Sequence, residues 1–550
     1  MKSIYYIPVL LMSFFTLGSC NDWLDVNDNP DSANSTIPTA EQRLPSLISQ
    51  FADSYESAGT RAALISQQLS CVYAVNNNWN WTRWYSTASS VGWPWQAWYV
   101  NTGVNVDPII AAAEKEGAFH YVGAAKVIKA MGFGFMADLY GMLPYRQAFD
   151  ESTYTPEFDD CEYVYSQILP LLDEAITYLE MEQTNKMAPD LAEGDILNGG
   201  KVDNWIRLAY GLKARFLNHL NKQASYNPDA ILAALAKAPQ TVAQSSILQY
   251  VDESPAATTT QASLQYVNTG TTIRFTKLYI DYLKNTYPGA PAAAVGVEDP
   301  RINLIIPSYQ KADGTYVRSE GVDMTSDLPS KGPSAYSYNV SKARYIASNT
   351  SRPGDTIYVQ LRKLTATDGR VVSTGSWYTE RGGKGLLLTH SEMKFIEAEV
   401  KFRKGDKPGA LIAYKAGIRG HMEILGVPEA AINTYLNGPA VAQTANELTL
   451  SLIMIQKYIA LSFSPEVFTD LRRNDFCCDA SGNYNEATGV YKGFKRPSHV
   501  YTISYPSETD WPRRFAVPSY EVNYNIDMVQ AADPDAASNT YISKKVWWDK

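Results

Sequence analysis

The longest helical pattern in the chain covers residues 119–143. Apolar and small side chains recur there at alternating intervals of four and three, which places them on one face of an α-helix. The side chains on that face are Tyr121, Ala125, Ile128, Gly132, Phe135 and Leu139. Several glycines lie beside this face, and each lowers the helix propensity by about 1 kcal/mol. We therefore expect a neighbouring helix to pack closely against this one.

The same periodicity predicts further helices on both sides of a less regular region. They cover residues 159–180, 202–220, 391–404, 408–425 and 447–462, with a short helix from Pro465. Long helices joined by polar connections favour antiparallel pairs that pack side by side. The pattern therefore predicts a mainly α fold.

Residues 241–385 differ from the rest of the chain. They are rich in Thr, Ser, Gly, Pro and Tyr, and helical periodicity is weak outside residues 275–285. This composition is typical of loops that carry short strands. We therefore predict an N-terminal helical part with an aromatic loop (37–240), a loop-rich insertion (241–385), and a C-terminal helical part with an irregular tail (386–550).

The first 36 residues have the pattern of an export signal and a tether. An apolar run over residues 4–17 is too short to span a bilayer and ends in Leu-Gly-Ser-Cys, which favours a secretory signal peptide over residues 1–19. The small residues before Cys20 look like a bacterial lipobox, so Cys20 is the predicted lipidated residue; an ordinary signal with a chance cysteine is the alternative. Residues 20–36 contain four aspartates and suit a solvated, flexible tether.

Overall charge and cysteine content narrow the function. The chain has 57 acidic and 48 basic residues, a net charge of −9, which argues against nucleic-acid binding because that function needs a basic face. The four cysteines after Cys20 are too few for a disulfide framework, and their pairing is not predictable from sequence. They are Cys71, Cys161, Cys477 and Cys478.

The aromatic stretch, residues 76–99, holds six of the twelve tryptophans among amide and hydroxyl side chains and no acid. Flat apolar rings in polar company suit a partly wet surface that binds a ring-shaped or extended ligand. The predicted ligand-binding residues are Trp79, Trp81, Trp84, Tyr85, Trp93, Asn78, Asn80 and Arg83. Core packing is the alternative throughout, and we favour it for Trp95, Trp98 and Tyr99, which lead into a helix.

A second group of aromatic and amide side chains lies in the loop-rich insertion. Its members are Tyr336, Tyr338, Asn339, Trp377 and Tyr378. They are second-choice ligand-binding residues, because packing that stabilises the loops is the favoured explanation for them.

Catalytic and metal sites find little support in the sequence. The five histidines are scattered without metal-binding spacing, so no metal or cofactor is expected. Glu392, Glu397 and Glu399 share one predicted helix, whereas glycosidases place two carboxylates across a cleft. The loop that begins at Asp479 has oxygen-bearing side chains at alternate positions, but Gly482 is misplaced for a calcium-binding loop. A polar turn is the favoured interpretation there, with structural calcium as the alternative.

Several segments together resemble the SusD/RagB family of Bacteroidetes outer-membrane lipoproteins. They begin with the lipobox at Cys20, followed by WLDVNDNPD. The others are VGAAKVIKAMGFGFMADLYGMLPY (122–145), DPR (299–301), LTHSEMKFIEAEVKFRKG (388–405), QKYIALSFSPEVFTDLRR (456–473), RRFAVPSYEVNYN (513–525) and VWWD (546–549). No single segment is decisive, but their order and spacing cover nearly the whole chain.

This resemblance implies tetratricopeptide-like helix pairs and a binding protein without catalytic activity. It also implies a lipid anchor in the outer membrane at the cell surface, and a SusC-like TonB-dependent barrel transporter as the partner. The implied ligand is an oligosaccharide, with an oligopeptide as the alternative; a helical-repeat scaffold that binds only proteins is a third possibility from another class. The family's binding positions vary between members, so the resemblance assigns no site residues.

Sugar capture agrees with the chemistry of the aromatic stretch. A sugar ring presents an apolar face to an indole and a rim of hydroxyls to Asn and Arg. Three rings that each bury on the order of 80 Å² contribute roughly 6 kcal/mol, against about 4 kcal/mol or more for lost ligand freedom. We expect dissociation constants of about micromolar to millimolar.

Overall fold

A computed structural model describes residues 38–550, apart from 72–76, 251–272, 307, 311–315, 319–320, 326–363, 366–370, 374–375 and 380–382. The predicted signal peptide, Cys20, the tether, Tyr336, Tyr338 and Asn339 lie outside the described residues. In the part that is described, the chain is mainly helical, which confirms the predicted fold class.

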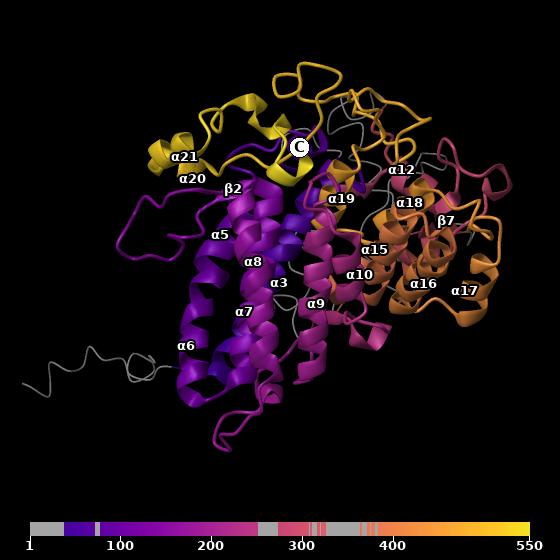
Figure 1. The fold of residues 1–550 in the computed structure, drawn as a ribbon. Helices are drawn as coiled ribbons and strands as arrows, with labels where there is room; N and C mark the ends of the chain where they lie inside the picture. Colours follow the sequence, from indigo (N-terminus) through magenta and orange to yellow (C-terminus); the bar gives the residue numbers. More distant parts are fainter. Residues whose placement is uncertain are drawn as a thin grey trace, which may run out of the picture.

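Helix α3 (Ala40–Ile65) lies at the centre of the helical body, behind α8 and α9 in Figure 1. It begins after Thr39, whose backbone N–H donates to Gln42 Oε1 at 3.2 Å, a bond that satisfies one free N–H group at the start of the helix. Its C-terminal half is buried almost all round, and it contacts helices α4 to α7 and α19. Helices α4 to α7 and α19 are therefore arranged around α3.

The N-terminal helices pack in sequence order, with α7 against α6 and α8, and α8 against α9. Their bounds are α6 Val106–Glu116, α7 Phe119–Tyr140, α8 Cys161–Glu180, α9 Val202–His219 and α10 Pro228–Leu235. These bounds agree with the predicted helices at 119–143, 159–180 and 202–220. Helix α8 is capped by Asp160, whose carboxylate accepts from Tyr163 N.

The glycines of α7 admit close neighbours, as the sequence predicts. A Cβ atom at Gly123 would lie 2.5 Å from Leu179 of α8, and one at Gly134 would lie 2.2 Å from the ring of Phe216 on α9. At Gly132 it would lie 2.0 Å from the indole of Trp98. Only glycine leaves room for these contacts, so the lost helix propensity is offset by packing.

The C-terminal helices form a second packed set, on the right of Figure 1, in which α15 runs along α16 and α18. Their bounds are α15 His390–Arg403, α16 Lys407–Leu425, α17 Glu429–Leu436, α18 Leu450–Ala460 and α19 Glu466–Arg473. Side chains of Thr389, Asp406 and Thr449 cap the first, second and fourth of these helices. Both sets are tetratricopeptide-like helix pairs.

Short antiparallel strands and small helices lie in the connections within and between the two sets. The strand pairs are β1 (Leu69–Cys71) with β5 (Ile273–Phe275), β4 (Ser246–Gln249) with β10 (Lys384–Leu388), and β2 (Met142–Leu143) with β3 (Asp159–Asp160). A four-stranded sheet has the order β7 (Tyr316–Arg318), β6 (Ser308–Gln310), β9 (Val371–Ser373), β8 (Leu364–Thr365). The helices here are η4 Leu191–Glu193, η5 Val242–Gln244, α12 Lys277–Lys284, η6 Ala292–Ala294, α13 Ile302–Ile305 and η8 Trp377–Thr379.

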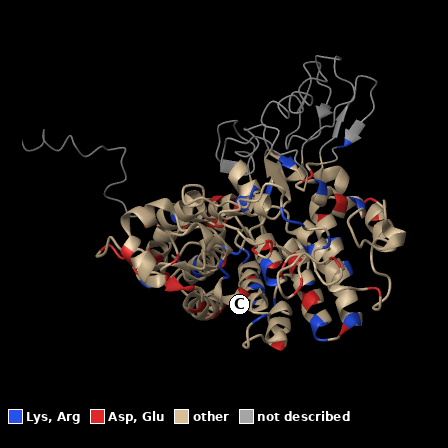
Figure 2. Cartoon of the chain, turned by 90° about the horizontal axis from the view of Figure 1, so that it is seen from above, with Lys and Arg blue, Asp and Glu red and all other residues tan. Residues whose placement is uncertain are grey.

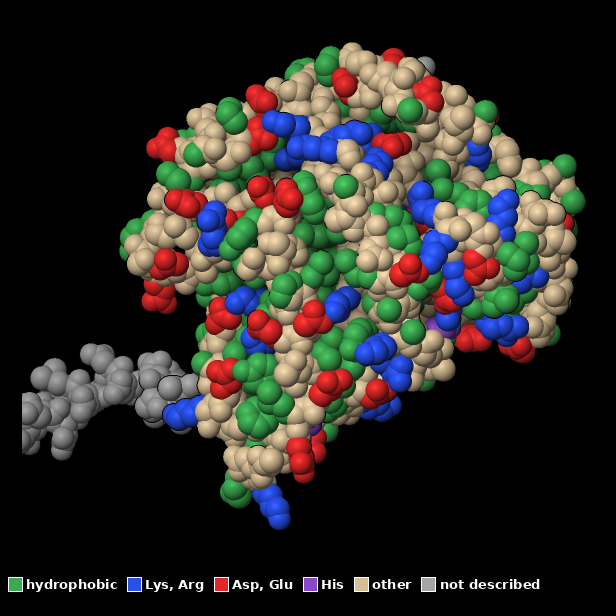
Figure 3. All heavy atoms as spheres, in the orientation of Figure 1, with side chains coloured by type: hydrophobic (Ala, Val, Ile, Leu, Met, Phe, Trp, Pro, Cys, Tyr) green, Lys and Arg blue, Asp and Glu red, His purple; other side chains and the backbone are tan. Residues whose placement is uncertain are grey.

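The C-terminal tail crosses the upper ends of both helical sets in Figure 1. Its helices are α20 Ser519–Tyr524, α21 Ile526–Ala532, η9 Asn539–Ser543 and η10 Trp547–Asp549. Figure 3 shows a group of basic side chains beside this tail. Within the tail, Lys544 pairs with Asp533 at 2.7 Å, and Asp549 pairs with Arg513 at 2.9 Å. Seen from above, residues of both charge signs are spread over the helical body (Figure 2).

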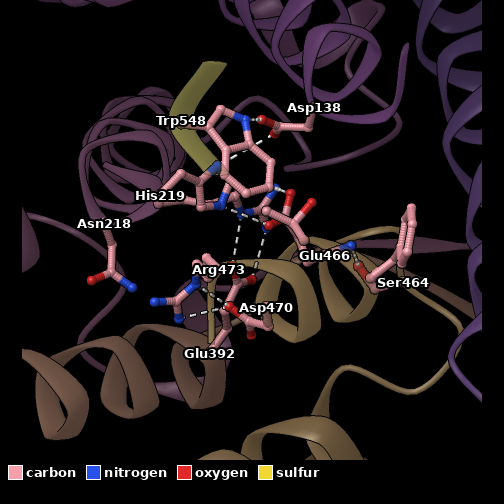
Figure 4. A network of polar contacts seen from close by, with 12 residues as sticks. Asp138, Asn218, His219, Glu392, Ser464, Glu466, Asp470, Arg473 and Trp548 are labelled. Atoms are coloured by element: carbon pink, nitrogen blue, oxygen red, sulfur yellow. Dashed lines mark hydrogen bonds and ion pairs between the residues drawn. The ribbon is translucent and has the colours of Figure 1, made fainter. Parts of the chain in front are cut away.

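Buried ion pairs connect the two helical sets (Figure 4). Arg215 of α9 donates two hydrogen bonds of 2.7 Å to the carboxylate of Glu392 on α15. His219, one turn further along α9, bonds Glu466 of α19 at 2.9 Å and lies 3.3 Å from Asp138 of α7. Trp548 of the tail donates to Asp138 at 2.8 Å. Charged groups from four helices and an indole from the tail therefore meet in one buried network.

The ring of His219 is held as a cation. Burial alone would lower its pKa, but Asp138 and Glu466 raise the pKa to about 9. In the same network, burial would raise the pKa of Glu466, but His219 and Arg215 hold it below the usual value. A charged imidazolium between two carboxylates thus holds α9 against α7 and α19.

Replacing His219 with Gln should therefore lower the free energy of unfolding by about 3–5 kcal/mol near neutral pH, because two buried carboxylates lose their cation. Since the folded pKa lies above the unfolded value, the wild-type advantage should be complete below pH about 6.5 and should disappear as the pH rises through about 9. Urea unfolding of both proteins across this pH range measures the difference in their free energies of unfolding. His120→Gln, at a partly exposed histidine, is the control, and a His219→Gln curve parallel to wild type through pH 9 would contradict the assignment.

Candidate functional site

The aromatic stretch folds back along α3 in the opposite direction. It comprises α4 (Asn77–Thr82), α5 (Gly92–Gln96) and the π-helical turn η2 (Ala97–Thr102). Trp84 Nε1 donates to the carbonyl of Ile65 at 2.9 Å, near the end of α3. Ser54 Oγ, three turns earlier in α3, donates to the carbonyl of Pro94 at 3.1 Å. The order of these contacts fixes the stretch against the helix.

Three predicted ligand-binding tryptophans are buried, and the expectation that they lie open to a ligand is wrong. Trp79, Trp81 and Trp84 are 7%, 1% and 0% exposed. The Trp81 ring packs edge-on against Phe515, with 4.7 Å between centroids. Trp84 lies 5.3 Å from Trp511 and also contacts Phe494 and Tyr505. Rings from residues 494–515 therefore cover these indoles and make them part of the core.

The tryptophans predicted to be core residues are buried as expected. Trp95 contacts Tyr140 and Phe158, and Trp98 lies against Phe133 and Phe51. Tyr99 is partly buried, and its hydroxyl donates to the carbonyl of Pro144 at 2.6 Å.

The other first-choice residues have mixed surroundings. Tyr85 is half-buried and stacks on Tyr501 with 3.8 Å between ring centroids. Arg83 lies beside the same ring and donates to the carbonyl of His499 at 3.0 Å. Asn80 is half-buried, and the side chain of Asn78 is outside the described part of the chain. A partly accessible aromatic pair thus remains at this end of the stretch.

The described second-choice residues belong to the loop packing. Tyr378 is buried, and its hydroxyl hydrogen-bonds His421 Nε2 at 2.8 Å. Trp377 is half-buried and packs edge-on against Tyr378, with 5.0 Å between centroids. The hydroxyl of Tyr378 therefore already has a partner inside the fold, and its ring is packed against its neighbours.

Trp93 is the first-choice tryptophan that the structure exposes, with 44% of its surface accessible. It lies on α5, and its side chain hydrogen-bonds the carboxylate of Asp53 on α3. Burial raises the pKa of Asp53, while Arg61 and the bond from Trp93 lower it, and the pKa remains raised overall. An indole held by its N–H at the surface presents its rings to solvent.

An acidic side chain that sequence reasoning missed lies one turn from Asp53. Glu56 is 8% exposed, and the hydroxyl of Tyr250, just after β4, hydrogen-bonds it. Burial is the main cause that raises the pKa of Glu56 to about 8; Tyr250 lowers it and Asp53 raises it further. A Cβ atom at Gly385 of β10 would lie 2.5 Å from Glu56 Oε1, so glycine makes room for this carboxyl group.

A cavity of about 30 Å³ opens beside Glu56. It lies where α3, β10 and the connection from α18 to α19 meet. Its lining includes Tyr55, Glu56, Tyr378, Lys384, Phe463 and Ser464. The space suits about one small polar group. Trp93, Asp53, Glu56 and this cavity, which we call the Trp93 site, form the candidate functional site.

Two groups of potential metal ligands have structural explanations. Asp138, His219 and Glu466 lie close enough to hold an ion, but both ring nitrogens of His219 already face hydroxyl or carboxylate oxygens. In the loop after Asp479, the aspartate Oδ1 accepts from the amides of Ser481 and Asn483. These bonds make that segment a polar turn.

Comparison with known proteins shows the family. Residues 33–490 match the SusD-like family model, whose description is "Starch-binding associating with outer membrane". The match covers most of the chain, so the protein belongs to the SusD-like family, as its resemblance to SusD/RagB proteins predicted. A search of curated proteins found no match. Among the described residues, no helix has both the length and the apolar character that crossing a membrane requires.

Solved structures share the fold at low sequence identity. A chitin-binding protein has a TM-score of 0.64 and 20% identity, with 93% of this chain and 100% of that chain covered. A SusD/RagB family protein from Bacteroides thetaiotaomicron has a TM-score of 0.64 and 20% identity, with 93% and 99% covered. A SusD homologue from Bacteroides fragilis has a TM-score of 0.65 and 19% identity, with 94% and 100% covered.

The difference in burial between Trp81 and Trp93 can be tested by measuring the free energy of unfolding of variants. Trp81→Ala should lower the free energy of unfolding by about 3–5 kcal/mol, because it empties a large volume of the core. Trp93→Ala should change it by less than about 1 kcal/mol, because the ring is half in solvent. Chemical denaturation of both variants beside wild type measures this, and equal losses would show that the two rings are packed alike.

Proposed function

We propose that this protein is a lipid-anchored, cell-surface binding protein that captures oligosaccharides. It passes them to a SusC-like TonB-dependent transporter of the outer membrane and performs no chemistry on them. Membership of a family described as starch-binding and outer-membrane-associated supports the ligand class and the location. The lipobox that ends at Cys20 supports the anchor.

The observation that carries the proposal is the exposed ring of Trp93. An indole fixed by a hydrogen bond loses little freedom when a sugar lies on it, so most of the burial energy is available for binding. Its neighbours Asp53 and Glu56 supply polar groups of the kind that sugar hydroxyls bind. Tyr85, Arg83 and Asn80 form a second accessible group along α3 and are proposed as further contacts for an extended ligand.

Oligopeptide capture by the same architecture is the second candidate. The chain's aromatic surface suits peptide side chains as well as sugars, but the observed site lacks a free sheet edge along Trp93, since α5 is helical. A scaffold that binds only protein partners is the third candidate. It would need neither the exposed indole nor the cavity beside it.

Replacing Trp93 should weaken oligosaccharide binding without unfolding the protein. We expect Trp93→Ala to raise the dissociation constant about tenfold or more, since burial of one ring face on the order of 80 Å² is worth about 2 kcal/mol. Trp93→Phe should retain part of the affinity. Titration calorimetry with hexameric malto-, cello-, xylo- and chito-oligosaccharides and with short peptides measures this.

Tyr154→Ala is the matched control, because Tyr154 is a 97% exposed aromatic residue in another loop. Equal affinity in Trp93→Ala and wild type would exclude Trp93 as the binding surface. Binding of peptides alone would favour the second candidate. Co-purification with a large barrel protein, with no sugar or peptide bound at millimolar concentration, would favour the scaffold.

The anchor is tested separately at Cys20. In a bacterium with an outer membrane, the wild-type chain should incorporate labelled palmitate and fractionate with membranes. Cys20→Ala should lose the label and leave the membrane fraction, because the acyl chains supply the membrane affinity. Cys71→Ala is the control at a cysteine in the folded body. Label retained in Cys20→Ala would contradict lipidation at this residue.

A further inference from the structure

Glu56 has a hydrogen-bonding atom that the described fold leaves unused. Its Oε2 atom is buried and has no hydrogen-bond partner, while the Tyr250 hydroxyl bonds the carboxyl group. Buried polar atoms in proteins nearly always have a partner, and an unpaired one costs about 1–3 kcal/mol. Glu56 also lines the cavity described above, so a group that enters the cavity reaches this carboxyl.

The other polar groups around the cavity are already engaged. Ser464 Oγ bonds the hydroxyl of Tyr55 at 3.1 Å, and Ser462 Oγ bonds the hydroxyl of Tyr279 at 2.6 Å. Thr389 Oγ1 accepts from the backbone of Glu392 at 3.1 Å. Among the described side chains of the lining, Glu56 Oε2 is therefore the buried polar atom without a hydrogen-bond partner.

The cavity and the exposed indole are connected through side chains of α3. Asp53, which holds Trp93, is three residues before Glu56 on α3, and side chains three apart on a helix are neighbours. Asp53 is close enough to raise the pKa of Glu56. Trp93 and the cavity are therefore linked through the neighbouring carboxyl groups of Asp53 and Glu56.

The charges around Glu56 favour a neutral ligand group. Asp53 repels an anion, and Lys384, which lines the cavity, repels a cation. The titratable and charged groups that surround Glu56 or the cavity are Asp53 and Tyr55 of α3, Tyr250, Lys384 of β10, Tyr378 of η8 and Glu392 of α15. The cavity is too small for a whole sugar ring but large enough for one hydroxyl or hydroxymethyl group.

We propose that this cavity is a subsite for one neutral hydroxyl-bearing substituent of the captured sugar, and that this substituent forms a hydrogen bond with Glu56. The subsite rests on the proposed function, and it narrows the ligand class to sugars with a free hydroxyl or hydroxymethyl group beside the ring that lies on Trp93. Gly385 belongs to the subsite as the residue that leaves room for the carboxyl group.

The test compares Glu56→Gln and Glu56→Leu with wild type, using the hexasaccharide of the panel above that binds most tightly. Glu56→Gln should bind within about threefold of wild type at pH 6.5, because an amide still donates a hydrogen bond. Glu56→Leu should bind about tenfold more weakly, since one hydrogen bond is lost and the sugar hydroxyl stays unpaired. Glu180→Gln, at an exposed glutamate on α8, is the matched control.

The pH profile identifies the acid itself. Above pH about 8 the wild-type protein must reprotonate Glu56 to bind, so its affinity should fall up to about tenfold per pH unit, while Glu56→Gln should stay flat. The stability of the ligand-free protein is measured over the same pH range as a second test. Because the folded pKa is raised, wild type should lose stability relative to Glu56→Gln as the pH rises from about 4.5 to about 8.

The outcomes separate the subsite from the proposed function. If Trp93→Ala weakens binding while Glu56→Leu binds as wild type does, the subsite is wrong and sugar capture stands. If Glu56→Gln shows the same fall in affinity above pH 8 as wild type, Glu56 is not the group that binds. If no sugar binds the wild-type protein, both proposals fail. Should Glu56→Leu not fold, the Glu56→Gln profile and its stability curve still decide the question.

Discussion

The fold depends on charges that are buried in pairs between distant helices. Arg215 and Glu392 join α9 to α15, and the His219 cation joins α9 to α7 and α19. A buried charge without its partner costs several kcal/mol, so any packing that separates these helices is strongly disfavoured. The apolar faces supply most of the burial energy, but many arrangements could bury them. The ion pairs are satisfied when the two helical sets meet in this one.

Local sequence periodicity was enough to predict the helices, because each pattern is completed within about 20 residues. It was not enough to predict which tryptophans are exposed. Trp84 is covered by Tyr505, 421 residues further along the chain, and Trp81 by Phe515. The local sequence around an indole among Asn, Ser and Thr is the same whether or not distant side chains cover the ring in the folded protein. The family could be recognised from short segments in order, since that signal does not depend on burial.

The candidate site shows the same division between local and long-range information. Trp93 belongs to the aromatic stretch that the sequence singled out, although nothing local separates it from its neighbours. Glu56 was not predicted, since an acid in a helix is ordinarily a solvated residue. Its unusual character comes from Gly385 and Tyr250, which reach α3 through the β4–β10 pair. The sequence signal that could have identified Glu56 is an acid close to apolar residues of α3, Phe51 and Tyr55.

The position of Trp548 has a consequence for how the molecule is made. Its indole donates to Asp138, in the middle of the N-terminal helices, and the adjacent Asp549 pairs with Arg513. Trp548 and Asp138 are 410 residues apart in the chain, so Asp138 of α7 lacks this hydrogen-bond partner during most of translation. The buried network around Asp138 therefore cannot be completed until the last residues of the chain have been synthesised.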